Sequence, residues 1–266
     1  MSETFTTAPY PPALLDGQPA LILRLEAPLM AFGGPVIDHN GFTRRLPGLA
    51  QLTGLFANAL GWHHRDAERL ERLQDRLRFA AVVLREGREL VDYQTVDLGQ
   101  DHLVDTGWTT RGYREDRGKG EATRSTHIRL RHFRADGAVL VAVRLDPAEE
   151  EPTLDHLEQA LDQPARPLFI GRKSCLPATP INAGRVRAPD LRSALVAALG
   201  RAPAGEREPA RQDQQGALAA EWPASPGDRR IERLVDRRDW RNQFHGGERL
   251  VATGSLKPAT GAEAGS

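Results

Sequence analysis

The sequence predicts an α+β fold, and three observations carry this prediction. Short segments with apolar residues at every second position predict strands, as in residues 20–27, which read ALILRLEA. Longer segments with apolar residues three and four positions apart predict amphipathic helices, as in residues 46–61. In chain order the stronger elements are strand, helix, strand, strand, helix, strand, which is the order of the ferredoxin-like fold. We therefore expect a ferredoxin-like core over residues 19–200.

The first half of the core contains two predicted helices and two more predicted strands. The helix over residues 46–61 carries its apolar residues on one side and stops at Gly61, because glycine ends helices. Residues 66–77 show a second amphipathic helical pattern. Residues 79–84, FAAVVL, predict a strand, and residues 89–98 predict another.

The second half continues the alternation of strands and helices. Residues 138–145, AVLVAVRL, predict a strand, and residues 153–162 predict a helix with three leucines on one side. Residues 167–171, PLFIG, predict the last core strand, which runs into a glycine. Residues 189–199 predict a further helix with Pro189 at its start, where proline is tolerated.

The segments outside this core lack the same periodicity. Residues 1–18 contain three prolines and predict a flexible arm. Residues 201–228 are rich in Pro, Gly and Gln and predict a linker or loop. Residues 229–266 predict a small C-terminal β element and a tail, with strands over 230–235 and 248–253.

Composition narrows the class of protein. The 266 residues carry 36 basic and 36 acidic side chains, and this balance excludes no partner class, because a neutral chain can carry a local basic face. The single cysteine excludes an intrachain disulfide and a multi-cysteine zinc site, and it fits a reducing compartment. No apolar run approaches the ~20 residues that span a bilayer, and the first residues lack the pattern of a signal peptide. We therefore expect a cytoplasmic protein.

Motifs for catalysis, metals and cofactors are weak. The segment GRKS, residues 171–174, matches the end of a phosphate-binding loop only in part, because that motif needs glycine at position 166 and lysine at position 172. The eight histidines form neither an HExxH motif nor a paired Cys/His cluster. Cys175 follows two cations, but its apolar neighbours predict a small buried residue. We expect no catalytic residue, no metal and no cofactor.

The nucleic-acid signal lies in a charged insertion at about residues 99–134, between the two central strands. Residues 107–134 carry eight cations and three acids, and Trp108 and Tyr113 lie among them. Cations bind phosphates, aromatic side chains stack on bases, and glycines permit a close approach of the backbone. A solvated charged loop has the same composition, so composition alone leaves both interpretations equally open.

Three segments together resemble the RAMP-type proteins of CRISPR systems. They are LILRLEAPLMAFG (21–33), YREDRGKGEATRSTHIRLRHFRADGAVLVAVRL (113–145) and FIGRKSCLPATPI (169–181). The resemblance is strongest to CasD-type subunits of the type I-E Cascade complex and covers about residues 20–200. Gly-Arg-Lys-Ser-Cys at 171–175 is its most specific part.

The resemblance implies a RAMP/RRM-like ferredoxin fold whose charged insertion is a thumb. It implies a subunit that caps the 5′ handle of the guide RNA (crRNA), contacts the Cascade backbone subunit and large subunit, and reaches target DNA only indirectly, with no membrane partner. Because a separate subunit cuts the precursor in type I-E, it implies an RNA-binding structural subunit and not an enzyme. The expected RNA-binding residues are Arg44, Arg45, Trp108, Arg111, Tyr113, Arg114, Lys119, Arg124, His127, Gly171, Arg172, Lys173 and Ser174.

The glycine motif has a specific role in this interpretation. Gly171 lets the backbone approach RNA, Arg172 and Lys173 contact adjacent phosphates, and Ser174 donates to another phosphate oxygen. Cys175 turns toward the core. A turn with incidental cations is the alternative.

Two departures from the family pattern bear on the site. The usual Pro-Thr-Lys/Arg-Ser-Gly reads Pro47-Gly48-Leu49-Ala50-Gln51, so we expect Arg44 and Arg45 to substitute for the missing basic residue. Glu26-Ala27 replaces the usual small residue and glycine.

Two other functions stay open at this point. A metal-independent crRNA-processing endoribonuclease of the same superfamily needs a general acid and a general base. The candidates for these roles are His102, Tyr113, Lys119 and His127. A protein-only scaffold, in which the insertion binds protein and no RNA, is the alternative of another class.

Overall fold

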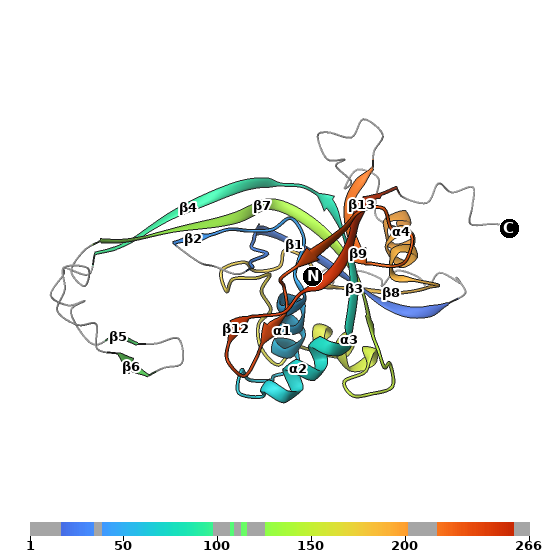
Figure 1. Cartoon of the computed structure of the whole chain (residues 1–266), viewed down its shortest axis with the longest axis horizontal. Helices are drawn as coiled ribbons and strands as arrows, with labels where there is room; N and C mark the ends of the chain where they lie inside the picture. The colour runs from blue at the N-terminus through green and yellow to red at the C-terminus, as the bar shows by residue number, and fades with distance from the viewer. Residues whose placement is uncertain are drawn as a thin grey trace, which may run out of the picture.

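The computed structural model describes residues 17–34, 39–97, 107–108, 113–115, 126–201 and 217–257. One large, mostly antiparallel sheet forms the body of the molecule, helices cover it, and a long hairpin projects from it (Figure 1). The α+β class that the sequence predicts is confirmed. No helix of the described residues is long and apolar enough to cross a membrane.

Four adjacent antiparallel strands form the main part of the sheet. In spatial order they are β3 (Leu77–Arg85), β7 (Thr126–Leu145), β1 (Gln18–Met30) and β8 (Asn182–Ala188), with β8 at the edge of the sheet. Val143 of β7 lies opposite Leu21 of β1 on one side and Phe79 of β3 on the other. Successive side chains of a strand point to opposite faces of the sheet, and both faces are buried here. This is why β3 and the second half of β7 are continuous apolar runs in the sequence.

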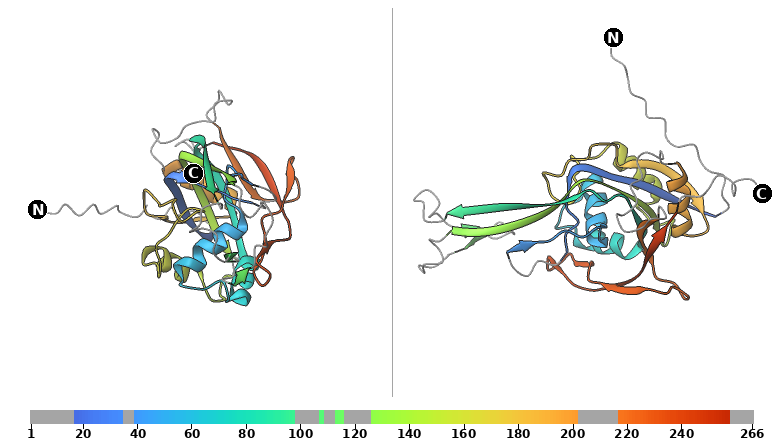
Figure 2. Two further views of the ribbon diagram at one scale, coloured as in Figure 1. Left: turned by 90° about the vertical axis from the view of Figure 1, so that its left-hand side faces the viewer. Right: turned by 90° about the horizontal axis from the view of Figure 1, so that it is seen from above.

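Different helices cover the two faces. On one face lie α1 (Leu49–Ala59), α2 (Ala67–Arg76) and α3 (Leu154–Asp162), and on the other lies α4 (Leu191–Arg201) (Figure 2). Leu21, Leu23 and Leu25 of β1 pack in the first layer, whereas Ala20 and Ile22 pack in the layer under α4. The alternation in β1 therefore fills two separate apolar layers.

Three C-terminal strands extend the sheet beyond β3. β9 (Leu218–Pro223) pairs with β3, β13 (Arg249–Leu256) pairs with β9, and β10 (Ile231–Leu234) forms the edge. The two late strands predicted from the sequence overlap β10 and β13. The linker predicted over 201–228 is wrong in its last part, because Leu218 and Ala220 are buried in the layer under α4 and hold β9 in the sheet.

The same C-terminal segment caps α1. Gly48 at the start of α1 offers no side-chain acceptor, although the first backbone N–H groups of a helix need one. Asp236 supplies two, since its carboxylate accepts from Leu49 N at 3.1 Å and its backbone oxygen accepts from Ala50 N at 2.9 Å. Arg249 Nε donates to this carboxylate at 2.8 Å. The C-terminal strands and the first helix therefore belong to one packed unit.

The long hairpin is built by β4 (Arg88–Asp97) and the first half of β7 (Figure 1). β2 (Asn40–Gly41) lies parallel to β7 along this stretch. Residues 126–134, which the sequence places in the insertion, belong to the regular strand β7. Their many charged side chains hide the alternating apolar pattern by which a strand is predicted. Two short strands, β5 (Gly107–Trp108) and β6 (Arg114–Glu115), pair with each other.

The last core strand predicted over residues 167–171 is wrong. The chain turns there, because Gly171 has φ +95° and Ile170 N donates to Cys175 O at 2.8 Å across the turn. These local hydrogen bonds replace the ladder of a strand. The carbonyl of Ile170 still reaches the sheet, where it accepts from Ala31 N just beyond β1 at 3.2 Å.

β8 takes the place of the predicted strand beside β1. The sequence does not single out this segment, NAGRVRA, because only Val186 and Ala188 of its side chains are buried. Its position is set by pairing with β1 and not by an apolar pattern of its own.

Candidate nucleic-acid interface

The glycine motif, residues 171–175, forms a tight turn against the end of β1. A Cβ atom on Gly171 would lie 1.8 Å from the carbonyl oxygen of Ala31, so the backbone approaches β1 too closely for any side chain. Cys175 is fully buried beneath the turn. The glycine therefore serves the packing of the turn on the protein itself, whereas the sequence interpretation assigned it to an approach to RNA.

Arg172 ties this turn to the long hairpin. Its Nη1 donates to the carbonyl of His132 at 3.0 Å, and its Nη2 donates to the carbonyl of Gly41 at 3.0 Å. The guanidinium lies over the ring of Phe133, 4.5 Å from its centroid. Burial lowers the pKa of Arg172. The two nitrogens that the sequence interpretation assigns to phosphate thus hold β7 and β2 in place.

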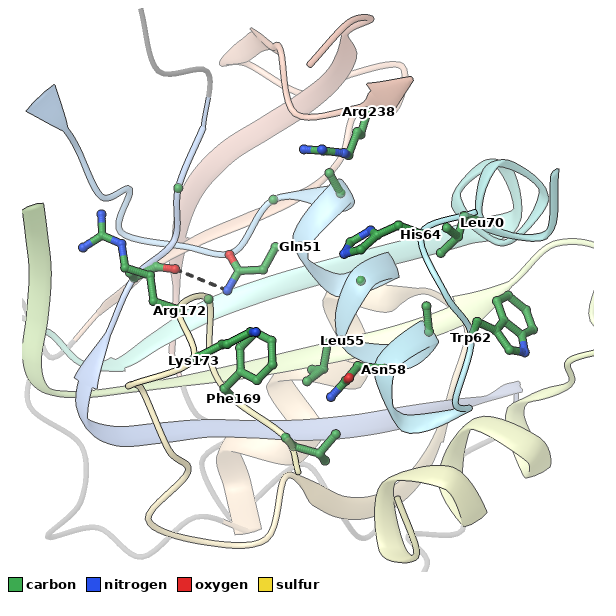
Figure 3. Close-up of a pocket in the computed structure, with 18 of the residues that line it drawn as sticks. Gln51, Leu55, Asn58, Trp62, His64, Leu70, Phe169, Arg172, Lys173 and Arg238 are labelled. Carbon is green, nitrogen blue, oxygen red and sulfur yellow. Dashed lines mark hydrogen bonds between the residues drawn. The ribbon is translucent and has the colours of Figure 1, made fainter. Parts of the chain in front are cut away.

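Lys173 and Ser174 differ from their neighbours because both are exposed. Lys173 lies beside Phe169 and points toward α1 in the close-up, while Arg172 points away from it (Figure 3). Of the four residues that the sequence places in the motif's RNA contact, these two have side chains positioned to meet a ligand.

Arg44 and Arg45 are engaged with carboxylates of the protein. Arg44 Nη2 binds both carboxylate oxygens of Glu221, at 3.0 and 3.1 Å, and Arg44 also lies 3.8 Å from Asp236. Arg45 Nε binds both oxygens of Glu86, at 3.0 and 3.2 Å. These contacts join the strand-to-helix segment to the sheet, and they argue against the RNA contacts predicted for the two arginines.

The insertion residues are placed only in part. Three predicted contacts, Arg111, Lys119 and Arg124, lie outside the described residues. Trp108 and Arg114 are opposite each other in the β5–β6 pair. Tyr113 is 70% exposed, and His127 is exposed near the end of the hairpin, opposite Val96.

A groove with a volume of about 800 Å³ runs over α1 beside the glycine motif (Figure 3). Ala50, Gly54 and Ala57, one helical turn apart, form its floor. Two of its walls come from residues 62–64 and from the loop over 166–176. A third wall comes from the hairpin of β11 (Arg238–Asp239) and β12 (Phe244–His245), with Trp240 in the turn between the two strands.

The end of α1 positions one wall of this groove. Gly61 has φ +78° and stops the helix, with Gly61 N donating to Asn58 O and Trp62 N donating to Ala57 O. This pair of hydrogen bonds is a Schellman motif, in which glycine takes the left-handed position. The chain then turns so that Trp62 and the two histidines after it line the groove.

The groove is positively charged. Arg166, Lys173 and Arg238 line it, and none of the three forms an ion pair with a carboxylate of the described residues. Asp236 is the one carboxylate among the described lining residues, and it is already bound to Arg249 and to the start of α1. An anion entering the groove therefore meets cations whose charge is not balanced locally.

The pKa of His64 reflects this field. Burial lowers the pKa of His64, and the positive charges of Arg238, Arg166, His63 and Lys173 lower it further. The pKa of the nearby His245 is lowered as well, by burial and then by Arg238. Both imidazoles are therefore neutral at neutral pH in the free protein.

Sequence reasoning misses most of the groove. Arg238 and Trp240 come from RRDW (237–240), far from any motif, and Arg166 and Trp62 stand alone in the sequence. RRDW combines cations with an aromatic residue, and the same combination in residues 107–134 indicated nucleic-acid binding. Within the described residues, no group of three or more His, Cys, Asp and Glu side chains is arranged to hold a metal ion.

Comparisons with known proteins agree with this fold. A family model described as CRISPR-associated protein (Cas_Cas5) matches residues 20–252. The CRISPR system Cascade subunit CasD of Escherichia coli (strain K12) is 30% identical over 184 residues, which are 66% of this chain and 75% of that protein.

Two solved structures share the fold. A chain of a structure titled "CRISPR RNA-guided surveillance complex" superposes with a TM-score of 0.62 at 23% identity, covering 90% of both chains. A chain titled "Crystal structure of Cas protein" superposes with a TM-score of 0.51 at 24% identity, covering 89% of this chain and 94% of the other.

Proposed function

The chain belongs to the Cas5 family of CRISPR-associated proteins, and from this membership we propose that it is the subunit that binds the 5′ handle of the crRNA in a Cascade-like surveillance complex. In this role it caps one end of the guide RNA and joins the backbone subunit to the large subunit. It is a cytoplasmic RNA-binding structural subunit and not an enzyme, and it meets target DNA only through the assembled complex.

The positive groove beside the glycine motif is the observation that carries this proposal. Single-stranded RNA is bound by cations that follow its phosphates and by aromatic side chains that stack on its bases. The groove offers both, with the cations Arg166, Lys173 and Arg238 and the aromatic residues Trp62 and Phe169 among its lining side chains. Phosphate contacts at this edge set the register of the RNA.

The fold supports the same role. The order β3-β7-β1-β8, with α1 and α2 before β3 and α3 before β8, is the order expected of a ferredoxin-like core, and it supports the proposal. In this proposal the β4–β7 hairpin is the stalk of a thumb that reaches over the RNA to the backbone subunit. Arg172 fixes the root of that thumb to the glycine motif.

Two measurements test this function. The chain is expressed with the other subunits of its own locus, and RNA that co-purifies through a tag on this chain is sequenced. We expect mature crRNA, and the isolated full-length chain should bind the 5′-handle RNA of its own repeat at least tenfold more tightly than a scrambled RNA of equal length, about 1.4 kcal/mol. Assembly of the complex with no preference for handle RNA would support the protein-only scaffold instead.

A further inference from the structure

We propose that the groove binds one unstacked nucleobase of the RNA in a pocket formed by α1, residues 62–64 and Trp240, which we call the base pocket. This inference rests on the proposed function and deepens it, because it assigns sequence-sensitive recognition to the C-terminal hairpin β11–β12. The charged insertion and the glycine motif, where the sequence signal lies, then set position, and the base pocket sets specificity.

The shape of the groove fits a flat ring. Ala50, Gly54 and Ala57 leave the surface of α1 low, so a planar group can lie against the helix. The Trp240 indole borders this floor, since a Cβ atom added to Gly54 would lie 3.8 Å from the edge of its ring. A volume of about 800 Å³ is within the range of small-molecule and cofactor sites and exceeds the need of one base.

The rings of His64, Trp62 and Phe169 line the groove and are open to it in part, and RNA-binding proteins use such rings as stacking surfaces for unpaired bases. Trp240 is buried and lies behind His64. The rings of His64 and Trp240 are nearly parallel, at 21°, with their centroids 6.4 Å apart. The guanidinium of Arg238 lies 5.4 Å from the centre of the Trp240 ring, so a positive charge lies beside these two rings. Trp62 and Phe169 line the groove on the side away from this pair.

Polar groups without partners point to a ligand with hydrogen-bonding edges. Trp240 is 4% exposed, and its indole N–H finds no acceptor among the described residues. The side-chain oxygen of Gln51, which also lines the groove, finds no donor there. A buried donor or acceptor left unpaired is costly, and native proteins rarely keep one without a reason. A nucleobase carries donors and acceptors on its edge and satisfies such groups.

Charge favours RNA over a protein segment as the occupant. Arg166, Lys173 and Arg238 stand around the groove without carboxylate partners among the described residues, and this spread matches a phosphate before and after the bound base. An apolar or basic protein segment would leave these three cations unbalanced, whereas RNA brings a phosphate on each side of every base.

The experiment combines changes in the RNA with changes in the protein. The probe is the 5′-handle RNA of the protein's own repeat, in a series in which one nucleotide at a time lacks its base. Dissociation constants are measured for the full-length chain and for His64→Ala and Arg238→Gln. His64 is only partly covered by its neighbours and belongs to none of the buried apolar clusters, so its removal leaves the core packing in place. The matched control is Arg230→Gln, which removes an arginine just before β10 that pairs with Glu232 and lies outside the groove lining.

We expect one position in the series to weaken binding by the wild-type chain about tenfold, because base stacking and edge contacts are lost there. In His64→Ala and in Arg238→Gln, loss of that same base should cost about twofold or less, whereas Arg230→Gln should keep the wild-type penalty. Coupling of this kind isolates an interaction between one base and one pocket.

Three other results would overturn the base pocket, and they are distinguishable. If no base position couples to His64 or Arg238 while handle RNA still binds tightly, the base pocket is wrong and the proposed function stands. If the pocket variants bind every RNA normally but fail to join the partner subunits, the occupant is protein. If the wild-type chain does not prefer handle RNA at all, the proposed function fails together with the pocket.

Discussion

Arg172 and Lys173 are adjacent cations with different surroundings, and this difference is testable. Arg172 donates to two backbone carbonyls and stacks on Phe133, whereas Lys173 is exposed at the groove. Lys173→Ala should leave the free energy of unfolding within about 0.5 kcal/mol of wild type, as for most surface changes. It should lower the slope of log affinity against log salt for single-stranded RNA by about 0.7, because one phosphate contact is lost.

Arg172→Ala should show the reverse pattern. Loss of two charge-assisted hydrogen bonds should lower the free energy of unfolding by about 1–3 kcal/mol, measured by urea denaturation. The salt slope should stay close to that of wild type, because Arg172 makes no direct phosphate contact in this arrangement. Equal slopes in wild type and Lys173→Ala, together with a reduced slope in Arg172→Ala, would return the phosphate contact to Arg172.

His64 gives RNA binding a pH dependence. Burial, and then the charges of Arg238 and Arg166, hold the pKa of His64 below its usual value of 6.5 in the free protein. A bound phosphate adds negative charge near the ring and raises this pKa, so binding takes up a proton. The gain in affinity is complete below the free-state pKa and disappears as the pH rises through the bound-state pKa.

The affinity for handle RNA should therefore increase as the pH is lowered from about 7.5 to about 5.5, and His64→Gln should flatten this dependence. The free protein should behave oppositely. Because the folded-state pKa of His64 lies below the unfolded value, its contribution to stability is present above that value and is lost as the pH falls. His39→Gln serves as the control, since His39 lies outside the groove lining. A wild-type affinity that does not change with pH would rule out the proton uptake.

The sequence locates the glycine motif but cannot assign the work of its residues. Gly171, Lys173 and Cys175 lie within five consecutive residues. Only the fold shows that Gly171 packs against Ala31, whereas the side chain of Lys173 is exposed. Trp240 shows a second limit of prediction from sequence, because it packs against α1 although the two are far apart in the sequence. Local pattern predicts which residues are cationic or aromatic, and tertiary packing decides which of them share a groove.

At the scale of elements, Asp236 connects the C-terminal strands to α1. Asp236→Ala removes the acceptor for Leu49 N and leaves Arg249 without its carboxylate. Loss of a helix cap costs about 0.5–2 kcal/mol, and an unpaired buried charge costs about 3–5 kcal/mol. We expect the free energy of unfolding to fall by about 3 kcal/mol or more, measured by denaturant titration.

The matched variant Asp236→Asn keeps an oxygen acceptor at the same place but removes the charge. Its loss of stability should come mainly from Arg249, and the difference between the two variants gives the cap's share. If Asp236→Ala unfolds at the wild-type denaturant concentration, the C-terminal segment does not start α1.

The long hairpin should be separable from the core. Leu90 and Phe133 lie opposite each other at its root, and the strand pairs beyond them belong to the projecting part. Deleting residues 92–131 and joining Val91 to His132 through Asn-Gly, a preferred two-residue hairpin turn, should keep the root and its contact with Arg172.

The shortened chain should melt within a few degrees of wild type, because Tyr93 and Val96 in the deleted part are 60% and 49% exposed and contribute little to the core. Its incorporation into the multisubunit complex, followed by size-exclusion chromatography, should fail. Normal incorporation would show that the hairpin is not the thumb.

Elements whose own side chains fill the core are the ones that sequence predicts. The apolar runs of β3 and β7 and the helical pattern of α1 appear at their predicted places. Residues 167–171 are apolar too, but they fold as a turn whose Ile170 packs in the core, so burial alone does not distinguish turn from strand. β8 is the reverse case, because it is a strand with little apolar pattern of its own, and its pairing with β1 sets its position.

At the scale of the whole molecule, balanced charge does not oppose RNA binding, because many arginines of the described residues pair with carboxylates within the fold. Glu26 illustrates this, since it joins Arg24 and Arg85. Burial raises the pKa of Glu26, but hydrogen bonds from Arg85 and Arg24 outweigh this effect and lower it. The departure from the family pattern at this position is thus an internal ion-pair site. Carboxylates elsewhere in the fold are bound in such pairs, whereas the cations that line the groove outnumber its one carboxylate, Asp236, among the described residues.

The absence of strand scission is the last prediction, and it concerns the complete chain. General acid–base catalysis needs two titrating groups held in fixed geometry around the reacting hydroxyl, with a cation for the developing charge. Tyr113 is 70% exposed and His127 is exposed on the hairpin, which does not provide such a setting. His132 is the more ordered group, with its Nδ1 2.6 Å from Glu89, but its ring also packs on Phe42 at 4.9 Å.

The purified chain, free of partner subunits and with chelator present, should therefore leave a full-length repeat RNA intact over hours, as followed by denaturing electrophoresis. His127→Ala, Tyr113→Phe and His132→Ala are run in parallel on the same RNA. A single cut beside the repeat hairpin that disappears in any one of these variants would replace the capping role with a processing ribonuclease and would name its residue. A cut that persists in all three would place the chemistry on another residue of the chain, and one that also appears with an unrelated protein purified in the same way would identify a contaminant.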